Sequence, residues 1–145
     1  MASPVEAQVI LCDAAVADPG GKVHMLGAGW SVAGTPTAPQ AVAVLMKIPW
    51  DRANHRIPMA LRLLDADGRP VALPGPTGPQ VVESRGEIEV GRPAGMEPGS
   101  PIDASFALNV QAMPLVPGRY EWRLELAEST FSAAFQVRPA SPPLV

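Results

Sequence analysis

Proline and glycine recur at such short intervals along this sequence that long helices have no room to form. The chain of 145 residues contains 18 prolines and 13 glycines, many of them in clusters such as "DPGG", "LPGPTGP" and "RPAGMEPGSP". Proline breaks helices and lacks a backbone donor, while glycine adopts turn conformations that other residues avoid. Such clusters between apolar segments are typical of many short strands joined by turns.

Between these clusters, apolar and polar residues alternate with the period of a β-strand. The clearest case is the segment 119–128, "RYEWRLELAE", in which large apolar side chains occupy every second position. A strand places such residues on one face, whereas a helix would scatter them around its circumference. We therefore expect the inward face of this strand to consist of Tyr120, Trp122, Leu124 and Leu126.

The same reasoning predicts eight or nine strands along the whole chain. We expect them within residues 7–16, 22–32, 40–50, 57–71, 81–91, 102–110, 119–128 and 131–137. The segment 40–50 is apolar on both faces until Lys47, which predicts a central strand. This pattern predicts an all-β fold, an antiparallel Greek-key (immunoglobulin-like) β-sandwich of about seven to nine strands. A barrel or a jelly roll is the alternative.

One short stretch favours the Greek-key sandwich in particular. In such sandwiches, a tyrosine near the start of a strand bonds through its hydroxyl to the backbone of the corner before it. The stretch "LVPGRY" places Tyr120, the single tyrosine of the chain, directly after a Pro-Gly corner. Because 47% of the residues are apolar, the chain has material for one proper core. We expect a single domain over residues 1–138 and a flexible tail at 139–145.

The charge balance argues against nucleic acid and membrane as partners. The formal net charge is −3 and the chain has only two lysines, Lys22 and Lys47, so no clustered basic footprint exists. No apolar run is long enough to span a bilayer. The first eleven residues contain no basic residue, and no small residue directly precedes Cys12, so the start is a poor export signal. We expect a cytoplasmic protein.

Two stretches resemble ligand-binding loops only superficially. The stretch "LGAGWSVAG" begins like a dinucleotide fingerprint, yet Val32 stands where the third glycine belongs and no helix can follow. Gly27 and Gly29 are better explained as residues on one face of a strand, making room for a neighbour such as Trp30. The stretch "DADGR" lacks the ligands of a calcium loop and predicts a hairpin turn.

Metal ligands are scarce and poorly placed. The soft ligands are Cys12, His24 and His55. A first hairpin that pairs Val16 with Val23 puts Cys12 and His24 on opposite faces, and a slip by one residue still leaves them about 13 Å apart. We expect no metal or cofactor, and we interpret Cys12 as a small buried hydrophobe.

Two loops remain as candidate binding surfaces. The turn "PWDRANHR" carries Trp50, Asp51, Asn54 and His55, and the loop "GRPAGMEPG" carries Arg92 and Met96. An aspartate and a histidine on one loop are able to act as a catalytic base and the residue that orients it. The better interpretation is structural: Asp51 caps a single helical turn, Trp50 closes the end of the sandwich and His55 is solvated. We expect no catalytic residues. Trp30 completes the set of candidate binding residues.

The whole chain resembles a family of small, mainly actinobacterial proteins described as a domain of unknown function. The stretches that carry the resemblance are "LCDAA", "GKVHMLGAGWS", "IPWDRANHR", "EVGRPAGMEPGSP" and "PLVPGRYEWRLEL". The resemblance implies a cytoplasmic, stand-alone domain and brings no activity, cofactor or catalytic residue.

These observations predict a non-catalytic β-sandwich that acts by protein–protein association. We expect mainly self-association as a homo-oligomer, and possible partners include other cytoplasmic proteins. The contact is expected at an edge strand or at the loop around Met96, which we take to be exposed. The alternative is a module that binds a small ligand or a glycan through the loops at 49–56 and 91–101, and an enzyme ranks third.

Overall fold

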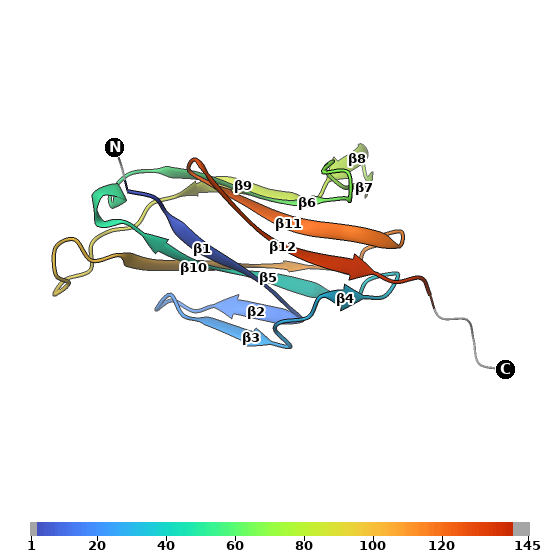
Figure 1. Ribbon diagram of the computed structural model, residues 1–145, viewed down its shortest axis with the longest axis horizontal. Helices are drawn as coiled ribbons and strands as arrows, with labels where there is room; N and C mark the ends of the chain where they lie inside the picture. The colour runs from blue at the N-terminus through green and yellow to red at the C-terminus, as the bar shows by residue number, and fades with distance from the viewer. Residues whose placement is uncertain (1–2, 141–145) are drawn as a thin grey trace.

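The computed structural model describes residues 3–140, so most of the tail predicted at 139–145 lies outside the described residues. The chain forms two packed β-sheets (Figure 1). Sheet I has the order β1 (Glu6–Cys12), β5 (Gln40–Ile48), β10 (Ile102–Val110), with every pair antiparallel. The prediction that the segment 40–50 forms a central strand is confirmed, because β5 has a neighbour on each side.

Sheet II has five strands, in the order β4 (Val32–Ala33), β12 (Ser129–Val137), β11 (Gly118–Leu126), β6 (Ile57–Leu64), β9 (Glu83–Ile88). Only the short β4 runs parallel to its neighbour. The chain crosses from sheet to sheet between β4 and β5, β5 and β6, β9 and β10, and β10 and β11. These crossings are Greek-key connections, so the predicted immunoglobulin-like sandwich is confirmed.

Two hairpins and one 3₁₀ turn complete the fold. The first hairpin, β2 (Ala14–Ala17) with β3 (Val23–Leu26), lies over the outer face of sheet I (Figure 1). The second, β7 (Ala72–Gly75) with β8 (Gly78–Val81), joins β6 to β9, and the 3₁₀ turn η1 (Trp50–Arg52) follows β5. No α-helix occurs within residues 3–140.

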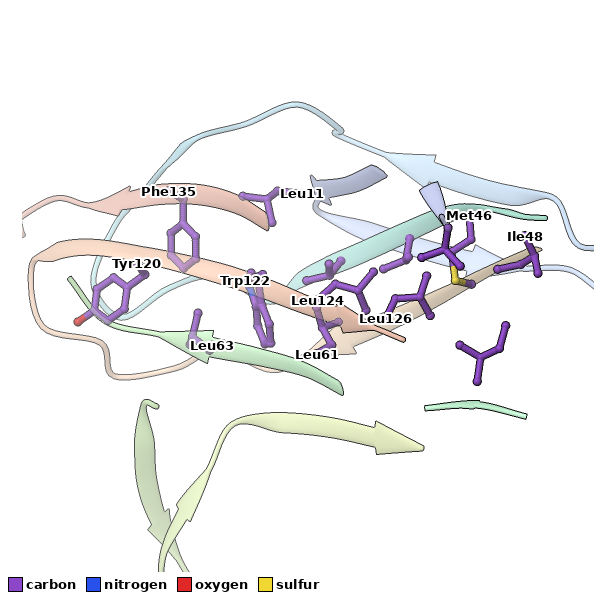
Figure 2. Packing of buried hydrophobic residues seen from close by; sticks show 14 of the residues in the cluster. Leu11, Met46, Ile48, Leu61, Leu63, Tyr120, Trp122, Leu124, Leu126 and Phe135 are labelled. Atoms are coloured by element: carbon purple, nitrogen blue, oxygen red, sulfur yellow. The ribbon is translucent and has the colours of Figure 1, made fainter. Parts of the chain in front are cut away.

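The core fills the space between the two sheets (Figure 2). The prediction for the strand after the Pro-Gly corner is confirmed, since Trp122, Leu124 and Leu126 are fully buried and Tyr120 nearly so. A second, smaller cluster lies between sheet I and the first hairpin and consists of small side chains: Cys12, Ala15, Ala41 and Ala43. Alanines on the outer face of β5 let the hairpin approach closely, which adds a partial third layer to the sandwich.

The tyrosine corner is also confirmed. The hydroxyl of Tyr120 donates to the carbonyl of Val116 over 2.6 Å, and its ring stacks on Phe135 with 5.7 Å between centroids. Immunoglobulin domains carry a disulfide cysteine two residues after this tyrosine. Here that position is Trp122, whose Nε1 donates to Oε1 of Gln40 on β5 over 3.0 Å. A buried indole–amide hydrogen bond thus links the two sheets.

The N-terminal strands differ from the prediction in three ways. The expected strand 7–16 breaks at Asp13, where the chain turns from sheet I into the hairpin. Val16 pairs with His24 rather than Val23, because the carboxylate of Asp18 accepts from two backbone amides of the turn and sets its length. Gly27 and Gly29 lie in a bend with φ of +62° and +94°, not on one face of a strand.

The segment 73–80, whose breaker residues predict an irregular connection, forms most of the hairpin β7–β8 instead. Its prolines Pro74 and Pro79 face each other in a two-stranded ladder that belongs to neither main sheet. Leu73 packs against the core cluster, which supplies the burial that keeps the hairpin ordered despite its breakers.

Candidate functional site

Trp50 lies in the turn after β5 with one ring face covered. The guanidinium of Arg92 stands 4.6 Å from the centroid of the Trp50 ring. The same group donates from Nη2 to the carbonyl of Trp50 over 2.8 Å. A cation held over an aromatic face in this way is a stabilising contact. The two predicted loops are therefore brought together, but they bind each other through Trp50 and Arg92.

Asp51 anchors the N-terminal segment. Its carboxylate accepts from the backbone N–H of Ser3 over 3.1 Å and from the Ser3 hydroxyl over 3.3 Å. These bonds, the backbone one first, lower the pKa of Asp51. Arg52 adds a bond from Nε to the carbonyl of Ser3 over 2.7 Å. Asp51 thus has a structural partner in the chain itself.

Asn54 and His55 continue the same turn without joining a catalytic arrangement. Asn54 adopts a φ of +62°, and its backbone N–H donates to the carbonyl of Val90 over 2.7 Å. His55 is exposed and makes no side-chain hydrogen bond to any residue within 3–140. Asp51 and His55 are therefore not coupled as a base and its orienter.

The remaining two candidates separate from this group. Met96 is half-buried and packs against the core, so its expected exposure is wrong. The loop 91–101 that carries it lies at one end of the sandwich (Figure 1). Trp30 belongs to the opposite end, where its ring meets Phe135 edge-on at 5.4 Å between centroids. Its Nε1 is buried and has no hydrogen-bond partner among the described residues.

A large cavity lies away from these loops, between the tip of the first hairpin and the outer face of sheet I. Its volume is about 700 Å³. One wall is the hairpin tip, and the floor and far wall come from β1, β5 and β10. The residues that line it are Glu6, Ala7, Gln8, Gly21, Lys22, Val23, Leu45, Met46, Lys47, Asp103, Ala104 and Ser105. We call this space the hairpin pocket.

Sequence reasoning missed the hairpin pocket because no local pattern places the hairpin over sheet I. Alternation along β10 does put Asp103 and Ser105 on the outer face. The contacts that hold the hairpin there join residues 84 or more apart in sequence, namely Ser105 to Gly21 and Asn109 to Ala15. Nothing in a single sequence marks such a pair in advance.

Besides the hairpin pocket, this region contains the free edge of β10, the side of the strand along which no other strand of sheet I pairs. The carbonyl of Leu11 accepts from Gly29 over 2.8 Å, so the backbone groups of Leu11 face away from β5. Backbone groups alternate in direction along an antiparallel ladder, and Val42 lies opposite both Leu11 and Leu108. The backbone N–H and C=O groups of the even-numbered residues of β10 therefore form the hydrogen bonds to β5. The residues whose N–H and C=O groups face outward are Asp103, Ser105, Ala107 and Asn109.

This edge is longer and less protected than the other sheet edges within residues 3–140. It spans nine residues, and its only charged residue, Asp103, pairs with Lys47 inside sheet I. The edge of β9 carries Glu83, Arg85 and Glu87 among its six residues. The edge of β1 lies beside β12, and β4 is only two residues long. Charges and short strands protect edges against pairing, whereas β10 is long and its single charge is already paired.

Several kinds of site are not found in the part of the chain that the structure describes. Residues 3–140 hold no group of three or more His, Cys, Asp or Glu side chains placed to bind a metal ion. No helix in the same range is long and apolar enough to cross a membrane. The chain matches no model of a known protein family and no curated protein.

Proposed function

We propose that this protein is a non-catalytic interaction module that forms a homodimer by pairing β10 with β10 of a second copy. The observation that carries the proposal is the nine-residue free edge of β10, with four residues whose backbone groups face outward. Unpaired backbone groups at an open edge are a template for a further strand.

The chemistry of the strand suits self-pairing. Apolar residues on its inner side, such as Phe106 and Leu108, remain half-buried because no further strand covers them. A fourth strand stands at this position in many immunoglobulin-type sheets. A second copy of β10 would occupy that position and extend sheet I across both molecules.

Two-fold symmetry follows from the antiparallel arrangement. If the axis passes at Phe106, all nine residues overlap, and Ser105 lies opposite the partner's Ala107. The outward-facing backbone groups then meet one another, because odd-numbered residues oppose odd-numbered residues. An isologous dimer of this kind is the commonest closed assembly.

A proline at position 105 tests the pairing. The N–H of Ser105 points away from β5, so Ser105→Pro removes a donor from the free edge and leaves the ladder to β5 intact. Ser105→Ala is the matched control, since it loses the same hydroxyl but keeps the N–H. We expect sedimentation velocity to show a dimer for the wild type and for Ser105→Ala, and a monomer for Ser105→Pro.

Hydrogen exchange provides a test without substitution. The amides of Ser105 and Ala107 have no acceptor within the described chain, so a partner strand has to protect them. We expect their protection to fall on dilution while the amide of Leu108, bonded to β5, stays protected. A wild type that is monomeric over the whole micromolar range overturns the proposal and favours the small-ligand alternative.

A further inference from the structure

The hairpin pocket has fixed walls on two sides. The hydroxyl of Ser105 donates to the carbonyl of Gly21 over 2.6 Å, which ties the hairpin tip to β10. On the far side, Lys47 pairs with Asp103 across neighbouring strands. The pocket therefore exists before any ligand arrives, which is the usual state of small-molecule sites.

The pocket gathers an unmatched pair of opposite charges. Both lysines of the chain line it, although they are 25 positions apart in sequence. Lys47 is occupied by Asp103, whereas the ammonium of Lys22 and the carboxylate of Glu6 form no ion pair or hydrogen bond within residues 3–140. Lys22 stands on the hairpin wall and Glu6 on β1, so the two charges face one cavity from different elements.

Apolar side chains line the same pocket as these charges, one on the hairpin wall and one on the floor. Leu45 on β5 and Val23 on β3 are both half-buried and line the same space. The complementary ligand has an apolar body with a cation at one end, toward Glu6, and an anion at the other, toward Lys22. A singly charged ligand leaves one of the two side chains unmatched, and a neutral ligand leaves both unmatched.

The volume indicates the size of such a ligand. About 700 Å³ holds on the order of twenty water molecules at roughly 30 Å³ each. A ligand with a similar number of non-hydrogen atoms is a di- or tripeptide with aliphatic side chains, whose free termini supply the two charges.

We propose that the hairpin pocket binds a short apolar peptide with free termini, the ammonium end at Glu6 and the carboxylate end at Lys22. The two charged contacts, Glu6 and Lys22, lie outside β10, although Asp103, Ala104 and Ser105 of that strand also line the pocket. Both side chains are exposed, so each ion pair contributes modestly, equivalent to a factor of about two to five in affinity.

Isothermal titration with the tripeptide Leu-Ala-Leu tests the proposal. We expect binding to the wild type, and affinity two- to five-fold weaker for the N-acetylated and for the C-amidated peptide. In Lys22→Met, amidation should no longer matter while acetylation still does. In Glu6→Gln, acetylation should no longer matter while amidation still does. This cross pattern assigns each terminus to one side chain.

Two distant substitutions serve as controls. Arg56→Met and Glu87→Gln remove an exposed charge pair at the edge of sheet II, outside the hairpin pocket, and should leave all three affinities unchanged. Failure of the free peptide to bind, or equal binding of free and blocked peptides, overturns the proposal. A monomeric wild type that shows the cross pattern overturns only the dimer, so the two proposals fail separately.

Discussion

At the scale of single residues, two side chains of β11 hold the sandwich at its centre. Tyr120 closes the corner before the strand by bonding to Val116, and Trp122 bonds across the core to Gln40. The bond of Trp122 is buried, and that of Tyr120 is partly buried. A polar group that loses its partner in such a place costs more than the bond itself contributes.

The corner bond can be removed with little change in packing. Tyr120→Phe deletes the hydroxyl and keeps the ring that stacks on Phe135. We expect a loss of about 1 kcal/mol in the free energy of unfolding, measured by urea denaturation. Equal stability of wild type and variant would show that water replaces the bond at this corner.

Because Trp122 and Gln40 are hydrogen-bonded, we expect the losses in unfolding free energy caused by substitutions at these two positions to be non-additive. Gln40→Leu leaves the buried indole N–H without its acceptor and should cost about 1–3 kcal/mol. Trp122→Ala leaves a cavity in the core and should cost about 3–5 kcal/mol. In the Trp122→Phe background no indole N–H remains, so Gln40→Leu should cost less there than in the wild type. Additive losses in this double-mutant cycle would contradict the coupling.

At the scale of elements, the first hairpin has little support from its own strand pairing. Its strands have four residues each and face sheet I through small side chains. The side-chain amide of Asn109 on β10 anchors β2 with two hydrogen bonds. Its Oδ1 accepts from the N–H of Ala15 over 3.2 Å, and its Nδ2 donates to the carbonyl of Ala15 over 2.7 Å. An isolated two-stranded hairpin is marginally stable, so this anchor decides its order.

Removal of the anchor should loosen the hairpin alone. We expect Asn109→Leu to speed hydrogen exchange of the amides in 14–26 about ten-fold, since two hydrogen bonds of about 0.5–1.5 kcal/mol each are lost. Exchange in β11 should hardly change. Ser105→Ala, which cuts only the contact at the tip, should show a smaller effect. Uniformly faster exchange in every strand would mean that the hairpin and the sandwich open together.

The N-terminal segment is held by a titratable contact. Bonding to Ser3 lowers the pKa of Asp51, so the contact is complete above the ordinary aspartate pKa of about 3.9 and is lost as the pH falls through the lower value in the folded protein. We expect the amide resonance of Ser3 to titrate with a midpoint below 3.9 in NMR spectra. Asp51→Asn should abolish this titration. A midpoint at or above about 3.9 would contradict the contact.

At the scale of the whole molecule, the outer faces of the two sheets differ in kind. The outer face of sheet II is covered by ion pairs such as Arg62 with Glu125 and Arg123 with Glu121. The outer face of sheet I carries alanines under a hairpin and, beside them, the hairpin pocket. One face is thus solvated, and the other carries the hairpin pocket next to the free edge of β10.

The reactivity of the Cys12 thiol measures how often the first hairpin detaches from sheet I, because Cys12 lies beneath the hairpin. The thiol is fully buried between β1 and the hairpin, and burial raises its pKa. A protonated, inaccessible thiol reacts slowly with disulfide reagents. We expect 5,5′-dithiobis-(2-nitrobenzoate) to label Cys12 only as the hairpin opens, hence faster in Asn109→Leu than in the wild type. Immediate labelling of the native protein would show that the hairpin does not cover it.

Local chemistry determined the class of fold. Pro-Gly clusters exclude long helices, and alternation along 119–128 assigns an inward and an outward face, because a strand repeats every two residues whatever surrounds it. The tyrosine corner was predictable for the same reason, since its donor and acceptor are four residues apart. The turn at Trp50 was predictable as a turn, but not as a partner of Arg92, 42 residues away.

Only the tertiary structure decided where the first hairpin packs on sheet I and which strand edge stays free. The register of the first hairpin depends on the carboxylate of Asp18 within its turn, and the position of the hairpin depends on Asn109 and Ser105, more than 80 residues further along. The hairpin pocket and the free edge of β10 arise from the order of strands and from what covers them. Such features depend on contacts between distant segments, and periodicity along one chain describes only the segment in which it occurs.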